Sequence, residues 1–99
     1  MGESTPATIT IRVNPQPTLK PVLMSDEGKD DITSACSLST CQQTFWFNGG
    51  NDYPAVNDYI YIDGYGKDYF NGGYQYYRMD NNNYILINGI GQVVELGLC

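Results

Sequence analysis

Short apolar and aromatic runs separated by Asn-Gly breaks limit the larger part of this chain to short β-strands. Asn-Gly pairs supply the positive φ angles of tight hairpin turns, so each break predicts a reversal of the chain. No stretch shows the apolar spacing of a helix of normal length. The sequence therefore predicts an all-β fold, a small antiparallel meander or sandwich of five to six short strands with an extended N-terminal arm. The runs cover residues 44–47, 58–63, 74–78, 83–87 and 93–98, and the breaks hold Asn48-Gly49, Asn71-Gly72 and Asn88-Gly89.

The first 31 residues differ from the rest and hold four of the five prolines. In residues 7–13, apolar side chains alternate with polar ones, the period of a half-buried strand. Residues 14–17 read Asn-Pro-Gln-Pro and should run extended, because proline lacks the N–H that pairing needs. Residues 20–24 can form one more short strand. We therefore interpret residues 1–31 as an anchoring arm and residues 32–99 as a Tyr-rich β domain, with partner contacts predicted at Ile9, Ile11, Val13, Val22 and Leu23.

Residues 32–43 are rich in Ser, Thr and Cys and predict a loop or an irregular strand. Alternation along the later runs assigns one side chain in two to the interior. The simplest core consists of Trp46, Ile60, Ile62, Ile85, Ile87, Val94 and Leu96.

The chain is acidic, with eleven acids, five bases and a net charge of -6 over its 99 residues. A nucleic-acid binder needs a basic face to displace counterions from phosphates, so neither nucleic acid nor an anionic membrane is an expected partner. No apolar run reaches the roughly 18 residues that span a bilayer. Residues 1–20 lack the basic start and apolar core of a secretory signal, so the chain is expected to be either made for the cytoplasm or a processed or cloned fragment.

Cysteine usage leaves two interpretations open for Cys36, Cys41 and Cys99. The first is three buried or half-exposed thiols, since free Cys behaves as a small hydrophobe. The second is a disulfide from Cys99 to Cys36 or Cys41, or between subunits. With no histidine and no Cys-x-x-Cys, the usual structural zinc arrangements are excluded within one chain, and neither a metal nor a cofactor is expected.

The absence of histidine also removes the commonest general base, and no catalytic residue is predicted. Pairs of carboxylates, such as Asp58 with Asp63 or Asp63 with Asp68, are the only candidates for acid–base chemistry on a sugar. Residues 63–68 and 80–83 cluster oxygens of the kind calcium prefers, without the EF-hand spacing. Aspartate and asparagine are also normal turn residues, and we interpret these clusters as turns.

Tyrosine is the strongest remaining bias, with nine residues beside a single tryptophan. Aromatic rings supply rigid contact area at low entropic cost. They can hold an oligomer, stack on sugars, or fill a half-buried sheet for which β propensity alone favours them. The predicted aromatic surface consists of Tyr65, Tyr69, Tyr74 and Tyr76.

Three patterns recur in a known family: Pro54-x-Val56-x-Asp58 before a Tyr-rich strand, residues 71–73 (Asn-Gly-Gly) before a Tyr-Tyr strand, and Ile87-Asn88-x-x-Gly91-x-Val93 near the end. Together with residues 34–41, they make residues 34–99 similar to a small module found in structural proteins of phages that infect Bacteroidetes and in surface proteins of those bacteria.

The resemblance implies a non-enzymatic virion protein, as capsid decoration, head fibre or tail appendage, located in the virion and made in the host cytoplasm. Its expected partners are other virion proteins and further copies of itself. A carbohydrate-binding surface module that adheres to a host glycan or mucin is the alternative from a different class.

Overall fold

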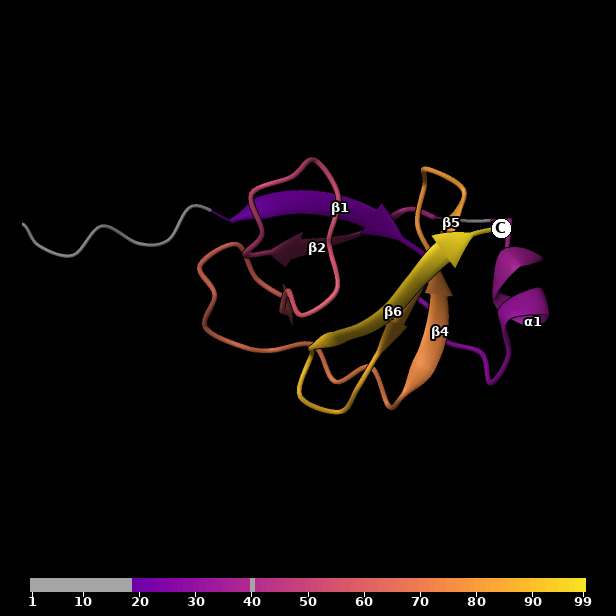
Figure 1. The fold of residues 1–99 in the computed structure, drawn as a ribbon. Helices are drawn as coiled ribbons and strands as arrows, with labels where there is room; N and C mark the ends of the chain where they lie inside the picture. Colours follow the sequence, from indigo (N-terminus) through magenta and orange to yellow (C-terminus); the bar gives the residue numbers. More distant parts are fainter. Residues whose placement is uncertain (1–18, 40) are drawn as a thin grey trace, which may run out of the picture.

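The computed structural model describes residues 19–39 and 41–99 of the chain. Its six strands form two three-stranded antiparallel sheets, as the sequence predicts (Figure 1). The first sheet has the order β1-β2-β3 and the second β4-β5-β6. The strands are β1 (Lys20–Met24), β2 (Gln43–Phe47), β3 (Ile60–Tyr61), β4 (Gln75–Arg78), β5 (Asn83–Ile87) and β6 (Val93–Leu98). The predicted strand at residues 7–13, with Ile9, Ile11 and Val13, lies outside the described residues.

The two sheets are joined edge to edge at two corners. At the first corner Met24 bridges Met79, and the backbone N–H of Ser25 donates to the carbonyl of Arg78 at 2.8 Å. At the second, the N–H of Val93 donates to the carbonyl of Asp58 at 2.8 Å. Hydrogen bonding therefore runs around a nearly closed ring of six strands, which is closer to a small barrel than to two separate layers.

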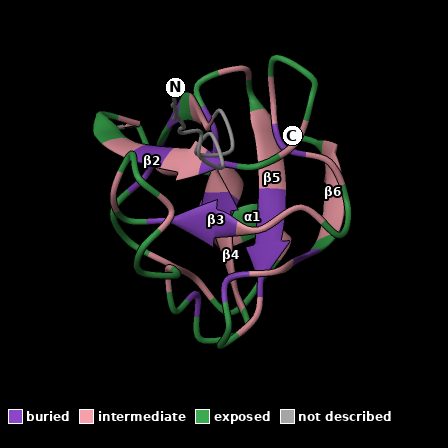
Figure 2. Cartoon of the chain, turned by 90° about the vertical axis from the view of Figure 1, so that its left-hand side faces the viewer, coloured by how far each residue is buried: buried purple, intermediate pink, exposed green. Residues whose placement is uncertain are grey.

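One hydrophobic core fills this ring. Buried side chains reach it from every strand, and Figure 2 shows β3 and much of β5 as buried. Ile60, Ile85 and Ile87 belong to it, as predicted. The core members are Val22, Met24, Phe45, Phe47, Ile60, Tyr77, Met79, Ile85, Ile87 and Val93.

Other core predictions are wrong. In β2 the interior takes Phe45 and Phe47, so Trp46 lies on the outer face and is half-buried. Ile62 follows the end of β3 and is 51% exposed. In β6 the interior takes Val93 in place of Val94, and Leu96 packs only partly against the core.

An irregularity explains the shift in β6. Val93 pairs with Ile87 and Glu95 with Leu86, so one residue, Val94, has no partner across the strand pair. Such a β-bulge inserts an extra residue and changes which side chains share a face. Val93 and Leu96, three positions apart, therefore both face the core.

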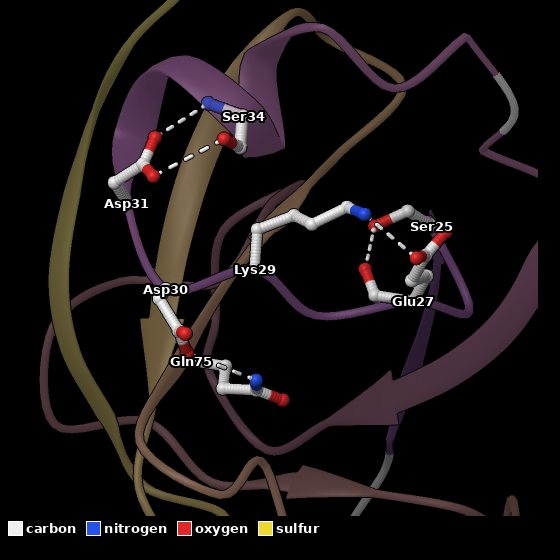
Figure 3. A network of polar contacts seen from close by, with 7 residues as sticks. All are labelled: Ser25, Glu27, Lys29, Asp30, Asp31, Ser34 and Gln75. Atoms are coloured by element: carbon white, nitrogen blue, oxygen red, sulfur yellow. Dashed lines mark hydrogen bonds and ion pairs between the residues drawn. The ribbon is translucent and has the colours of Figure 1, made fainter.

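Residues 32–43 contain a short helix where the sequence predicted a loop or an irregular strand. Helix α1 (Ile32–Cys36) begins at Asp31, whose side chain caps it by accepting the Ser34 N–H at 2.7 Å (Figure 3). It lies beside β4 and β5 (Figure 1). A guanidinium nitrogen of Arg78 donates to the Leu38 carbonyl just beyond the helix. Five residues are too few to show an apolar stripe in the sequence.

A disulfide joins Cys36, the last residue of α1, to Cys99. It ties the helix to the end of β6 across a sequence separation of 63 residues. The interpretation of all three cysteines as thiols is therefore wrong for this pair, while Cys41 is free and half-buried. Burial raises the pKa of the Cys41 thiol, which disfavours the reactive thiolate.

Residues 20–31, assigned from the sequence to the arm, are built into the β domain. Lys20–Met24 forms β1, which confirms the predicted short strand, and Lys29 exchanges backbone hydrogen bonds with Tyr76. One side-chain contact fastens the segment further, since Gln75 donates to Asp30 at 3.3 Å, and within the segment Lys29 pairs with Glu27 at 2.7 Å (Figure 3). The rest of the predicted arm, up to residue 18, is outside the described residues.

Candidate aromatic binding surface

The outer face of the first sheet carries a group of aromatic rings, some buried and some accessible. Trp46 of β2 and Tyr61 of β3 are direct partners across the strand pair, so both side chains point away from the core. Tyr69 stacks on Tyr61 with ring centroids 5.0 Å apart and planes inclined by 28°. Tyr59 meets Tyr69 at 5.4 Å. We call Trp46, Tyr59, Tyr61, Tyr65 and Tyr69 the aromatic face.

Exposure differs among these rings in a way that matters for binding. Tyr61 is buried, and that burial, with Tyr69 beside it, raises the pKa of the Tyr61 hydroxyl. Tyr69 covers Tyr61 and is 56% exposed, and Tyr65 is 79% exposed. A buried ring thus supports an accessible one, which fixes the accessible ring in place.

The loop of residues 63–68 closes one side of the aromatic face. Its Asp63 carboxylate accepts backbone N–H groups from Tyr65 at 2.8 Å, Lys67 at 3.1 Å and Asp68 at 2.8 Å. These hydrogen bonds, that of Lys67 first, hold the pKa of Asp63 below its ordinary value of 3.8. A carboxylate ringed by N–H groups fixes the loop, and with it the position of Tyr65.

Two glycines bring this loop against the sheet. A Cβ built on Gly64 would lie 3.2 Å from the Trp46 indole nitrogen, so the loop backbone passes close to that ring. Gly66 has a φ of +73°, and a Cβ there would lie 3.4 Å from the Leu19 side chain. Leu19 directly precedes β1. The chain therefore enters the described domain beside the aromatic face.

An open hollow of about 410 Å³ lies beside β1. Leu23 and Thr44, which pair across β1 and β2, form part of its wall, with Tyr53 and Asp80 opposite. The Tyr53 hydroxyl donates to the Asp80 carboxylate at 2.8 Å, and this hydrogen bond raises the pKa of Tyr53. Pro21, Val22 and Leu23 supply apolar lining to the hollow, and Thr44, Asp52 and Asp80 supply polar lining.

The predicted aromatic surface is only partly brought together. Tyr65 and Tyr69 belong to the aromatic face as defined above. Tyr74 is 61% exposed, in the turn before β4, and Tyr76 is a half-buried residue of β4 that meets Tyr84 edge-on at 5.7 Å. Tyr76 belongs to the second sheet and Tyr74 lies in the turn that leads into it, so neither joins the aromatic face.

The predicted partner-binding residues of β1 also separate. Val22 is 4% exposed and packs in the core, so its prediction as a partner contact is wrong. The alternation of β1 turns it inward and its neighbour outward. Leu23 is 39% exposed on the outer face.

Three members of the aromatic face, Trp46, Tyr59 and Tyr61, are absent from the predicted aromatic surface, and so is Tyr53 of the hollow. Trp46 was assigned to the core, because in Phe45-Trp46-Phe47 every side chain is apolar and alternation does not select a face. Tyr53 was one tyrosine among nine. Its position after Asn51-Asp52 and before Pro54 gave no sign that it would reach across to Asp80.

The acidic and amide side chains act as turn residues, as interpreted from the sequence. Asp58 accepts the Ala55 N–H at 2.8 Å, and Asn88 accepts from Ile90 and Gln92. Asn81 accepts from Asn83 at 3.1 Å. Among the described residues, no three acidic or cysteine side chains gather as metal ligands would.

Comparison with protein-family models, with curated proteins and with solved structures found no match to the chain. Within residues 19–39 and 41–99, no helix is long and apolar enough to cross a membrane.

Proposed function

We propose that the protein is a non-enzymatic virion component of a bacteriophage, a capsid decoration, head fibre or tail appendage, that docks on another virion protein through its aromatic face. The observation that carries the proposal is Tyr69, stacked on buried Tyr61 and still 56% exposed. Pre-positioned aromatic rings are the side chains that contribute most to protein interfaces. The resemblance of residues 34–99 to phage structural modules supports the virion setting.

The position of the chain's entry adds to this. Leu19 lies against the loop that carries Tyr65, so residues 1–18 join the domain at the edge of the aromatic face. A partner bound at this edge is within reach of both the aromatic face and the point where residues 1–18 join the domain. The net charge of -6 also agrees with a protein partner better than with nucleic acid.

The test compares virions assembled in the presence of each variant. In the double variant Tyr65→Ala/Tyr69→Ala, the amount of this chain in purified particles, measured by quantitative mass spectrometry, should fall at least tenfold. Tyr74→Asn is the matched control: it removes a tyrosine of similar exposure from the turn before β4, and asparagine accepts the positive φ of 59° found there. Absence of the wild-type chain from purified virions, or full incorporation of the double variant, would refute the proposal.

A second function, adhesion to a host glycan or mucin, is favoured by one specific observation. Tyr69 offers a ring that is backed by another ring, and exposed Lys67 in the adjoining loop offers a hydrogen-bond donor. Stacking on a sugar needs such a combination of apolar face and polar edge. Retention on immobilised mucin that is lost in Tyr69→Ala and kept in Tyr74→Asn would support adhesion, and no retention of the wild type would exclude it.

A further inference from the structure

The two outer strands of the second sheet differ in how their edges are covered. The edge of β4 is occupied by residues 24–30, where Lys29 and Tyr76 exchange hydrogen bonds of 2.9 and 2.8 Å. Among residues 19–39 and 41–99, the edge of β6 is occupied only at its start, where Val93 bonds to Asp58 and Asn57. An uncovered strand edge presents free N–H and C=O groups and is a template for another strand.

Alternation shows which groups of β6 point outward. In the turn after β5, Asn88 and Gln92 face each other, since the Asn88 N–H donates to the Gln92 carbonyl. Every second residue of β5 therefore bonds to β6, which directs Glu95 and Gly97 toward β5. The backbone groups of Leu96 and Leu98 consequently point away from the sheet. Within the described part of the chain, neither has a hydrogen-bond partner on that side.

The side chains along this edge are also sorted. Leu96 pairs with Ile85 and lies on the core side of the sheet, where Leu98 continues the same face and is 84% exposed. Glu95 lies on the opposite face and accepts the Tyr84 hydroxyl at 2.8 Å. A strand added here would find an apolar neighbour on one face and an acidic neighbour on the other.

Residues 7–13 have the matching pattern. Ile9, Ile11 and Val13 would extend the face of Leu96 and Leu98, and the polar alternates would lie on the face of Glu95. One of those alternates, Arg12, carries the charge that complements Glu95. The sequence Asn14-Pro15-Gln16-Pro17 predicts an extended linker, which favours delivery of the strand to a neighbour over its own domain.

We propose that residues 7–13 of one copy pair as an added strand with the outer edge of β6, at Leu96 and Leu98, in a second copy. The added strand covers Leu98 and completes the edge that the described residues leave open. This inference rests on the proposed structural role and names the chain's first partner as another copy of itself. Its test uses the purified chain alone, so its outcome is separate from incorporation into virions.

Two full-length variants separate the donor strand from the acceptor edge. Ile11→Pro removes an N–H from the added strand, and Leu98→Pro removes an outward N–H of β6 without touching the bonds to β5. Sedimentation should show the wild type at two or more times its 11.0 kDa mass and each variant alone as a monomer. An equimolar mixture of the two variants should form a 1:1 pair, because one still has the strand and the other still has the edge.

Controls keep the outcomes distinct. Gln16→Pro places the same residue in the linker and should assemble like the wild type, and Leu98→Val keeps the N–H and should do so as well. Amide exchange at Leu98 should be slowed at least tenfold in the wild-type assembly and not in Ile11→Pro. A wild type that stays monomeric at every concentration would overturn the proposal, in favour of an intramolecular strand if its Leu98 amide is protected. So would an Ile11→Pro variant that still assembles, or variants that do not pair when mixed.

Discussion

Gly72 is the position at which one methyl group should cost the most stability. A Cβ built there would lie 2.4 Å from the carbonyl oxygen of Ile87 and 2.5 Å from its Cβ, both of which belong to a core strand. The Gly72 N–H donates to the Asn88 carbonyl at 2.9 Å, and its own carbonyl accepts the buried Tyr77 hydroxyl at 3.0 Å. The Gly72 backbone therefore cannot move away from Ile87 without losing a hydrogen bond.

The magnitude follows from the kind of contact. Overpacking a core costs about 1–3 kcal/mol, and contact with backbone favours the upper part of that range for Gly72→Ala. For a domain of this size each kcal/mol lowers Tm by about 4–8 °C, so a loss of about 2–3 kcal/mol should lower Tm by about 8–24 °C. Thermal unfolding followed by circular dichroism, with the disulfide intact, measures it.

Gly50→Ala is the matched control for this prediction. Both glycines belong to an Asn-Gly-Gly triplet, but a Cβ on Gly50 meets nothing within 4 Å. Because alanine also restricts the unfolded chain, the control should be neutral or gain up to about 1 kcal/mol. Equal melting temperatures for the two variants would refute the close approach at Gly72.

Three further predictions concern the contacts that fasten the ring. Replacing Cys36 and Cys99 by serine should cost about 4 kcal/mol, the loop entropy of a closure of this length, measured as a lower denaturation midpoint in urea. Lowering the pH below about 4 should destabilise the wild type more than it destabilises Asp63→Asn. The pKa of Asp63 in the folded protein lies below its ordinary value of 3.8, so the carboxylate stabilises the fold at pH values above 3.8 and loses this effect as the pH falls through the folded pKa. Arg78→Lys should cost about 1–2 kcal/mol, since one ammonium cannot span the Leu38 carbonyl and the Asn82 amide oxygen as the guanidinium does.

Each of these predictions has a result that contradicts it. Cys41→Ser should change the free energy of unfolding in urea by less than about 0.5 kcal/mol. A loss equal to that of the disulfide variant would mean that the cysteines matter only through packing. A slope of Tm against pH that is the same with and without Asp63 would place the acid sensitivity elsewhere, with the Asp31 helix cap as the next candidate, since its pKa is also lowered. If Arg78→Lys and Arg78→Met are both as stable as the wild type, the guanidinium does not fasten α1.

Strand positions could be predicted from the sequence because each run is bounded by turn residues. The runs at 83–87 and 93–98 coincide with β5 and β6. Which side chains point into the core could not be predicted where this depended on more than the alternation along a strand. In β2 all three central residues are apolar, and in β6 the bulge at Val94 shifts the pattern by one. Both outcomes depend on packing against the other sheet.

The turns show a similar division. Asn88-Gly89 marks a true hairpin between β5 and β6, but the positive φ falls on Gly91, at +85°. The other tight hairpin, between β4 and β5, contains no glycine and uses Asn82 at a φ of +67°. The hydrogen bonds from Met79 to Asn83 and from Asn88 to Gln92 close loops of three residues, 80–82 and 89–91. Such loops place the left-handed residue last, so the Asn-Gly pair located the reversal without identifying its geometry.

The candidate site was harder to predict because tyrosine serves several purposes in this fold. Tyr77 is in the core, Tyr84 bonds Glu95, and Tyr76 packs on Tyr84, which leaves few tyrosines free to bind anything. Exposure separates Tyr65 and Tyr69 from them, and exposure depends on the loop that Asp63 holds. The direction in which the loop of residues 63–68 folds therefore decides which rings are available.

The same loop also connects the acidic residues with the aromatic ones. Asp63 was a candidate for acid–base chemistry or calcium, yet its oxygens are occupied by three backbone N–H groups. Occupied in this way, it fixes the loop that carries Tyr65 and whose Gly66 lies beside Tyr61. The carboxylate thus shapes the surface, and in the proposed function the contact itself falls to the rings, which is why we place recognition on the aromatic face rather than on the acids.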